Sequence, residues 1–218
     1  MLSFSGYAMG MSSHDSRRDV RFPDDLDQVV YLENVTWADY ERIAATRGDG
    51  SVPRLTYADG VLELMSPGHL HEFDKTTLAR LFEAYLVHLG IAADGIGSWT
   101  VKHKRKKRGA EADECYVFGG KGRDPTVKCP DLVIEVIYHS GSLDKLDVWH
   151  RLGAKEVWIW TLERKLEIFV RRANAFVPAK RSSLAPRVDT DLLVRCMERP
   201  NQLAALRALG RALAKRRR

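Results

Sequence analysis

Residues 131–138 (DLVIEVIY) constrain the fold more than any other stretch of this sequence. The run is almost continuously apolar, which is typical of a central strand buried on both faces of a sheet. Glu135 interrupts it, and in an extended strand its side chain shares a face with Val133 and Ile137. An ionised carboxylate in such surroundings is unfavourable unless it is paired or bound to a metal ion. The stretch therefore predicts a buried strand that carries a functional acid.

The elements around this strand predict an α/β fold. Apolar residues recur with a 3.6-residue period between a Ser66-Pro67 start and a Gly90 stop, which indicates a long helix. Asp59-Gly60 between two β-rich runs indicates a hairpin just before that helix. Further strands are expected at 97–104, 113–118, 156–161, 165–170 and 174–178, and further helices from Thr36, at 142–153 and at 203–213. The order helix, strand, strand, strand, helix, strand predicts a mixed central sheet flanked by helices.

Length and composition predict a single domain with a short segment at each end. The chain has 218 residues, of which 44% are hydrophobic and 29% charged, and this is the composition of a globular protein. We expect a flexible tail at 1–24, one domain at 25–198 and a basic helix or tail at 199–218. No apolar run approaches the roughly 18 residues that span a bilayer. The three cysteines form no CxxC pair, so a disulfide framework and a thiolate zinc site are disfavoured and a reducing cytoplasm is expected.

Positive charge is concentrated in two places. The formal net charge is +6, and residues 102–108 (KHKRKKR) hold six cations in seven positions. Such a cluster suits a polyphosphate partner, although a solvated loop has the same composition, and both interpretations stay open. For the basic C-terminus we favour the solvated interpretation. The cations of the first cluster are Lys102, Lys104, Arg105, Lys106, Lys107 and Arg108.

A second acid lies on the strand before the central one. Asp113 shares a strand face with Cys115, and if the two strands are neighbours it converges with Glu135. Carboxylates from adjacent strands make a hard-oxygen site suited to Mg²⁺ or Mn²⁺. Lys145, ten residues after Glu135 in the first turn of the next helix, is the cation expected to support phosphoryl chemistry there.

Each of these residues also has a purely structural interpretation. Glu135 could pair with a buried arginine, Asp113 could end a turn, and Lys145 could be an exposed helix residue. Glu72 could simply complement the dipole of its helix in the first turn. His69 and His71 are two apart and do not share a helical face, so no zinc motif is present. Nucleotide fingerprints and the GxSxG elbow are absent from the sequence as well.

Four segments together resemble the Uma-two family of restriction endonucleases, in the PD-(D/E)XK nuclease superfamily. They are RLTYADGVLELMSPGHLHE, GSWTVKHKRKKRGAEADECYVF, CPDLVIEV and HSGSLDKLDVWHRLGAKEVWIW, and the resemblance runs from about residue 36 to about residue 193. It implies a restriction-endonuclease-like core and metal-dependent hydrolysis of DNA phosphodiester bonds.

The resemblance also implies roles for individual residues. Asp113 and Glu135 match the two acids of the motif, and Glu72 matches a helix-borne acid that completes the Mg²⁺ or Mn²⁺ site. Lys145 matches a lysine that has moved from the strand to the following helix. The sequence departs from the pattern at Ile137, where the strand lysine of the wider superfamily would stand, and at Thr56, where many relatives carry glutamate.

Three hypotheses follow. The first is a Mg²⁺-dependent endodeoxyribonuclease in which the 102–108 cluster grips backbone phosphates. The second is a catalytically inactive nuclease fold that binds DNA or a protein partner. The third is a structural protein in which the buried acids are paired with arginines. An exposed edge strand near 165–170 would provide a two-fold contact for a homodimer.

Overall fold

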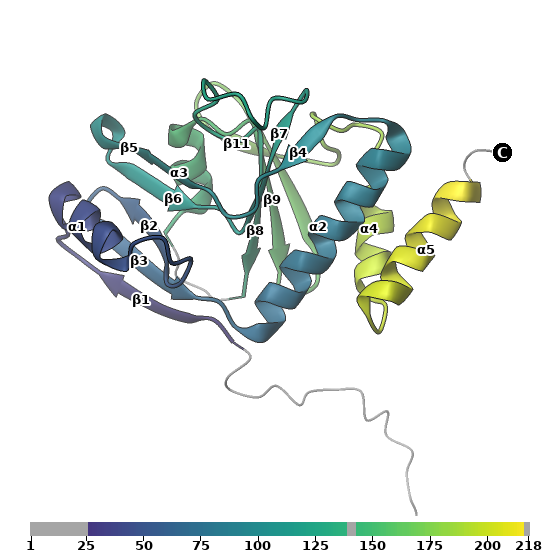
Figure 1. The fold of residues 1–218 in the computed structure, drawn as a ribbon, viewed down its shortest axis with the longest axis horizontal. Coiled ribbons are helices and arrows are strands. Elements are labelled where there is room, and N and C mark those ends of the chain that lie inside the picture. Colours follow the sequence, from purple (N-terminus) through teal and green to yellow (C-terminus); the bar gives the residue numbers. More distant parts are fainter. Residues whose placement is uncertain (1–25, 139–142, 216–218) are drawn as a thin grey trace, which may run out of the picture.

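The computed structural model describes residues 26–138 and 143–215 and contains two sheets (Figure 1). The tail expected at 1–24 lies outside these residues, as does Ser142, the expected start of a helix. One sheet has five strands in the order β1-β3-β2-β6-β5, and the other has six in the order β11-β10-β9-β8-β7-β4. The predicted α/β class is confirmed, but the strands divide between two sheets instead of forming one.

The five-stranded sheet is antiparallel throughout. Its strands are β1 (Gln28–Leu32), β2 (Arg54–Ala58), β3 (Val61–Ser66), β5 (Thr100–His103) and β6 (Arg108–Glu111). The predicted hairpin joins β2 to β3, and both residues of its turn, Asp59 and Gly60, have positive φ. Helix α1 (Trp37–Arg47) begins with a capping box between Thr36 and Asp39 and packs against one face of this sheet.

The six-stranded sheet is mixed, as predicted. Its strands are β4 (Ala93–Gly95), β7 (Glu114–Phe118), β8 (Leu132–Ile137), β9 (Glu156–Thr161), β10 (Leu166–Arg171) and β11 (Phe176–Ala179). Strands β8 and β9 pair in parallel and the other neighbours pair antiparallel. Every residue of β8 before Ile137 is buried, which confirms a central strand covered on both faces.

The remaining helices cover both faces of the mixed sheet. Helices α2 (His69–Leu89), α4 (Thr190–Met197) and α5 (Gln202–Lys215) enclose the larger core on one face. Helix α3 (Lys145–Leu152) packs on the other face, where Val148 and Trp149 meet Val133 of β8 and Val101 of β5. None of the helices in the described residues has the length and apolar character needed to cross a membrane.

The structure corrects four expectations of the sequence. Helix α2 begins at His69 with Gly68 as its N-cap, because Ser66 still pairs with Gln28 in β3. Helix α3 begins at Lys145, where the Asp144 side chain caps the backbone. The strand expected at 97–104 contributes β5 to the five-stranded sheet, and β4 takes the place beside β7. Strand β10 pairs on both sides, so the predicted dimer contact through an edge at 165–170 is wrong.

Candidate active site

Of the two predicted acids, Asp113 immediately precedes β7 and Glu135 lies within β8. The register pairs Glu114 with Ile134 and Cys115 with Val133, so the next pair outward is Asp113 with Glu135. The backbone N–H of Val136 donates to Asp113 Oδ2 at 2.7 Å. Asp113 is 1% exposed and Glu135 is 2% exposed. Two carboxylates thus share one buried location between the sheets.

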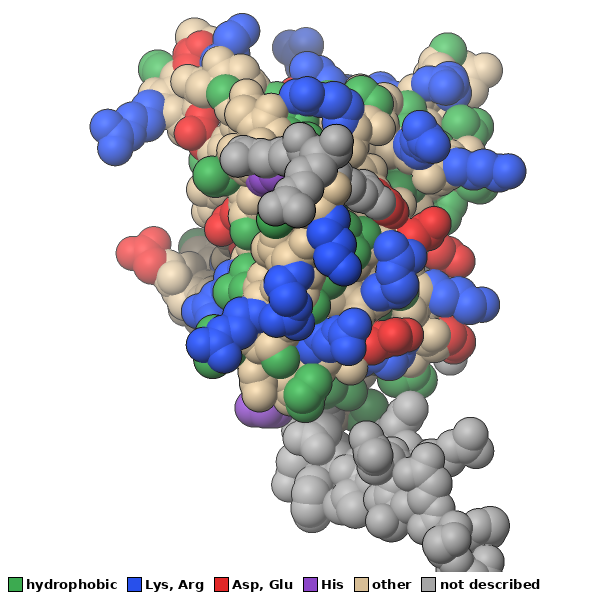
Figure 2. Space-filling model, turned by 90° about the vertical axis from the view of Figure 1, so that its right-hand side faces the viewer, with side chains coloured by type: hydrophobic (Ala, Val, Ile, Leu, Met, Phe, Trp, Pro, Cys, Tyr) green, Lys and Arg blue, Asp and Glu red, His purple; other side chains and the backbone are tan. Residues whose placement is uncertain are grey.

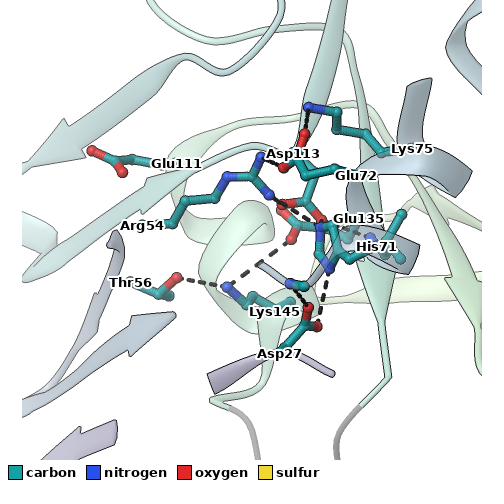
Figure 3. A network of polar contacts seen from close by, with 12 residues as sticks. Asp27, Arg54, Thr56, His71, Glu72, Lys75, Glu111, Asp113, Glu135 and Lys145 are labelled. Atoms are coloured by element: carbon teal, nitrogen blue, oxygen red, sulfur yellow. Dashed lines mark hydrogen bonds and ion pairs between the residues drawn. The ribbon is translucent and has the colours of Figure 1, made fainter. Parts of the chain in front are cut away.

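A guanidinium lies beside the first acid. Arg54, which reaches across from β2, donates to Asp113 Oδ1 and places its other terminal nitrogen 2.7 Å from Glu72 Oε1 (Figure 3). His71 Nε2 lies 3.1 Å from Asp113 Oδ2. Burial disfavours the charged carboxylate, but His71 and Arg54 outweigh it and hold the pKa of Asp113 well below its usual range. Asp113 is therefore ionised at neutral pH.

The second acid has different partners. Trp149 of α3 donates its indole N–H to Glu135 Oε1 at 2.7 Å, and Lys145 Nζ lies 4.0 Å from Glu135 Oε2. Burial raises the pKa of Glu135 to about 7, and the Asp113 charge adds to this against the opposing effect of Lys145. The two acids consequently differ in protonation behaviour although they face each other.

Lys145 is the first residue of α3, and its side chain is buried within the site. It is 7% exposed, and its ammonium group donates to Thr56 Oγ1 at 2.6 Å and lies 2.9 Å from Glu63 Oε1. Burial disfavours its charge, but Glu135 and Glu63 outweigh burial and raise its pKa. Lys145 therefore remains an ammonium, which donates hydrogen bonds and cannot act as a base.

His71 ties the start of α2 to the same network. Its Nδ1 lies 3.0 Å from Asp27 Oδ2, and the other oxygen of Asp27 accepts from the backbone N–H of Gly68 at 2.9 Å. Burial disfavours the imidazolium, but the Asp113 and Asp27 carboxylates outweigh it and raise the pKa of His71 to about 9. A doubly protonated ring can donate to both acids at once.

The predicted helix-borne acid lies at the rim of the site. Glu72 has 40% of its side chain exposed, and it contacts Arg54 and Lys75 rather than Asp113 or Glu135. Figure 3 shows Arg54 pointing between Glu72 and Asp113. Glu72 is thus linked to Asp113 through a guanidinium in this structure.

The basic cluster at 102–108 spans the end of β5, the turn at 104–107 and the start of β6, and its members differ in exposure. Lys102, Lys104, Arg105, Lys106 and Lys107 are exposed. Lys106 donates to the carbonyl of Arg151 at 2.7 Å, near the C-terminal end of α3. Since Lys145 begins this helix and Arg151 lies six residues later, the turn and the site lie about 9 Å apart along the helix axis.

Arg108 differs from the rest of the cluster. It is 3% exposed and pairs with Asp59 and Asp147, with 2.8 Å between Arg108 Nη2 and Asp147 Oδ2. These carboxylates hold its guanidinium inside the protein, so it is not presented to a phosphate. The predicted contact surface is therefore reduced to the five exposed cations between residues 102 and 107.

A second basic surface lies on the C-terminal side of the molecule. Figure 2 shows Lys and Arg side chains gathered on the face that includes α5. Arg199, Arg207 and Arg211 line a surface hollow of about 380 Å³ there. The predicted C-terminal helix is α5, whose Ala205, Leu209 and Leu213 are buried in the larger core. Its arginines are exposed, and residues 216–218 of the basic run lie outside the described residues.

Whether these residues fit a divalent cation depends on Arg54. Within residues 26–138 and 143–215, no three His, Cys, Asp or Glu side chains converge closely enough to hold a metal ion as they lie. The donors themselves are chemically suitable, because Asp113 and Glu135 supply hard oxygen from opposed positions. A metal ion between them would neutralise the charge of the Asp113 carboxylate, which Arg54 neutralises in this structure. Arg54 would therefore have to move away from Asp113 for a metal ion to bind.

The charge of the cluster favours such an exchange. Counting His71 as protonated, the cluster contains one carboxylate more than it contains cations. The acids are Asp27, Glu63, Glu72, Asp113 and Glu135, and the cations are Arg54, His71, Lys75 and Lys145. Excess negative charge in a buried cluster favours a bound cation or a protonated acid. On this basis the residues present fit a Mg²⁺ or Mn²⁺ ion.

Several residues of the site were not identified from the sequence. Arg54, Glu63 and Asp27 were not singled out, and His71 was considered only as a zinc ligand. A signal for Glu63 existed, because a two-residue turn at Asp59-Gly60 pairs position 56 with position 63. No comparable signal existed for Arg54, which reaches the site from a different sheet.

The sequence matches one family model and is similar to a solved structure. A family model named Uma2 and described as "Putative restriction endonuclease" matches residues 37–192. A solved structure described as "a putative nuclease belonging to DUF820 from Anabaena variabilis ATCC 29413" is similar at 12% identity and a TM-score of 0.44, covering 72% of this chain and 92% of that chain. No curated protein matches the sequence. Because the family model spans more than half of the residues, this chain belongs to the Uma2 family of restriction-endonuclease-like proteins.

Proposed function

We propose that this protein is a divalent-metal-dependent endonuclease that hydrolyses DNA phosphodiester bonds. The observation that carries the proposal is the placement of Asp113 opposite Glu135, with the ammonium of Lys145 4.0 Å from Glu135. Membership of a family of restriction-endonuclease-like proteins supports it independently. In this proposal Asp113 and Glu135 hold Mg²⁺ or Mn²⁺, and Glu72 supplies a further oxygen once Arg54 has moved.

The protein's own residues have separate tasks in this proposal. A bound divalent ion would lower the pKa of an attacking water and offset charge on the phosphoryl oxygens. Lys145 stays protonated and donates hydrogen bonds, so it orients the water or stabilises negative charge in the transition state. Trp149 fixes one oxygen of Glu135 and leaves the other for the ion.

The exposed cations of the β5–β6 turn are proposed to bind the DNA backbone. Lys104 and Arg105 form no ion pair with a carboxylate among the described residues, and a phosphate would satisfy their charge. Contacts to phosphate give affinity without sequence information, so binding should weaken steeply as salt is added. A homodimer and a cytoplasmic location stay predictions, the second resting on the three free cysteines.

Plasmid nicking tests the proposal. Supercoiled DNA is incubated with Mg²⁺, Mn²⁺ or EDTA and with the wild type, Asp113→Asn, Glu135→Gln and Lys145→Met. Each substitution should reduce the metal-dependent rate by on the order of 100-fold or more, because each removes a group that acts on transition-state charge. Glu167→Gln, an exposed acid on β10, is the matched control and should cut like the wild type. Equal nicking by all variants would mean that the activity belongs elsewhere.

One observation favours a second function, an inactive nuclease fold that binds DNA. Arg54 forms an ion pair with Asp113, and a pair of this kind can be permanent. Such a pair was also expected of a structural protein. In this alternative, calorimetric titration with Mn²⁺ gives no heat, and DNA binding survives both EDTA and Asp113→Asn. Heat of binding in the wild type that disappears in Asp113→Asn would favour the nuclease.

A further inference from the structure

Glu63 is a buried acid for which the proposed mechanism has no role. It lies in the middle strand of a three-strand row, opposite Tyr31 of β1 on one side and Thr56 of β2 on the other. It is 0% exposed, and the Tyr31 hydroxyl interacts with its carboxylate from the neighbouring strand. Its nearest cationic group is Lys145 Nζ, 2.9 Å from Oε1. Desolvating this acid is unfavourable, and a neutral hydroxyl and one ion pair at best offset that cost.

The ammonium of Lys145 is held mainly by the five-stranded sheet. It lies 2.6 Å from Thr56 Oγ1 and 2.9 Å from Glu63 Oε1, against 4.0 Å from Glu135 Oε2. An ammonium has three N–H donors, so Thr56 and Glu63 engage two and leave one for another acceptor. Thr56 and Glu63 thus direct the lysine from the side opposite to Glu135.

Stability alone does not account for this arrangement. Lys145 is the first residue of α3, and a helix N-terminus is the end where a positive charge is disfavoured. Desolvating both Lys145 and Glu63 adds a penalty that a buried ion pair at best offsets. An apolar pair of similar size would suit folding as well or better.

We propose that Thr56 and Glu63 are positioning residues that hold the ammonium of Lys145 beside Glu135. The inference rests on the proposed nuclease function and adds to it a two-residue anchor on the β2–β3 hairpin. Because residues 56 and 63 are direct partners in the register, their Cβ atoms lie about 5 Å apart. Exchanging the two side chains therefore keeps one carboxylate and one hydroxyl in front of Lys145.

The exchange provides the test. We compare Glu63→Thr, Thr56→Glu and the double variant that carries both changes, and we measure kcat, KM and the melting temperature of each. Glu63→Thr alone should lower kcat about 10-fold to 100-fold with little change in KM for DNA, and the double variant should recover most of that loss. Thr56→Val, which removes the hydroxyl, should lower kcat as well, whereas Thr56→Ser, which keeps it, should have a kcat near that of the wild type.

A second measurement is independent of catalysis. In metal-free protein labelled with ¹⁵N, a buried and hydrogen-bonded ammonium gives an observable ¹⁵Nζ signal. The Lys145 signal should be present in the wild type and the double variant and absent in Glu63→Thr. A wild type without nuclease activity would contradict the proposed function, whereas the ammonium signal still tests the anchor. Full activity in the isosteric Glu63→Gln, or an unchanged Lys145 signal in Glu63→Thr, would overturn the inference.

Discussion

Replacing Glu135 by glutamine separates a site acid from a structural ion pair. The amide has the shape of the carboxyl group, and its oxygen can still accept from Trp149. What the substitution removes is a charge that burial opposes, since burial raises the pKa of Glu135 from 4.5 to about 7 in the metal-free protein. The effect on stability therefore depends on pH.

The direction and size of the effect follow from proton linkage. In the unfolded chain the carboxyl group ionises near pH 4.5, whereas the native protein keeps the proton until about pH 7. Between these values the unfolded state binds fewer protons, so the free energy of unfolding falls as pH rises. At 1.36 kcal/mol for each pKa unit, the loss is about 3 kcal/mol and is complete above pH 7.

Urea unfolding in EDTA at pH 4.5 and pH 8 measures this loss. Taking the difference between wild type and Glu135→Gln at each pH removes the contributions of other titrating groups. Glu135→Gln should gain about 3 kcal/mol relative to wild type between the two pH values. Glu167→Gln, an exposed acid, should show no such gain. Adding Mg²⁺ at pH 8 should stabilise the wild type but not Glu135→Gln.

The opposite outcome has a clear meaning. Suppose that the wild type is more stable than Glu135→Gln, and that this advantage in the free energy of unfolding is larger at pH 8 than at pH 4.5. The ionised carboxylate would then stabilise the fold. Glu135 would then be the paired structural acid of the third hypothesis, and the reasoning that links its burial to metal binding would be wrong.

Three further variants test other parts of the structure. Arg54→Gln should destabilise the metal-free protein by about 3 kcal/mol, because it leaves a buried carboxylate unpaired, and Mn²⁺ should restore more stability to it than to the wild type in thermal unfolding. The double change Lys104→Gln and Arg105→Gln should weaken DNA binding and lower the salt slope of the affinity by up to about 2, measured by fluorescence anisotropy. Gly109→Ala should cost about 1–3 kcal/mol in urea unfolding, because its new Cβ would lie 2.7 Å from Cζ of the buried Tyr40.

Elements with a strong local pattern were predictable. The hairpin at Asp59-Gly60, the stop of α2 at Gly90 and the buried strand β8 depend on turn chemistry and on runs of neighbouring residues. Strand β1 was not predicted, although its sequence QVVYL is rich in β-forming residues. Strands β4 and β6 were not predicted either, because a three-residue strand and the sequence RGAE carry little β preference. Helix α4 was missed as well, although Asp189 caps it in the usual way.

The start of α2 shows how tertiary contacts override a local signal. Ser66-Pro67 has the composition of a helix start, but Ser66 completes the pairing of β3 with β1. Strand β1 begins at Gln28, and nothing in its sequence indicates that β3 is its pairing partner. Local preference yielded here to pairing between segments almost forty residues apart.

Some residues of the site were likewise predictable from local sequence patterns, whereas others depend on long-range contacts. Strand parity placed Asp113 and Glu135 on one face, and the β7–β8 register puts them opposite each other. Parity holds within a sheet, but it does not say which side chains of a second sheet face that position. Arg54 and Glu63 arrive from the second sheet, so the groups that neutralise or anchor the predicted residues follow from how two sheets pack. Local sequence patterns can therefore predict the acids of such a site but not the cations that pair with them. Arg54 and a metal ion compete for the Asp113 carboxylate, and local patterns do not predict which of them binds it.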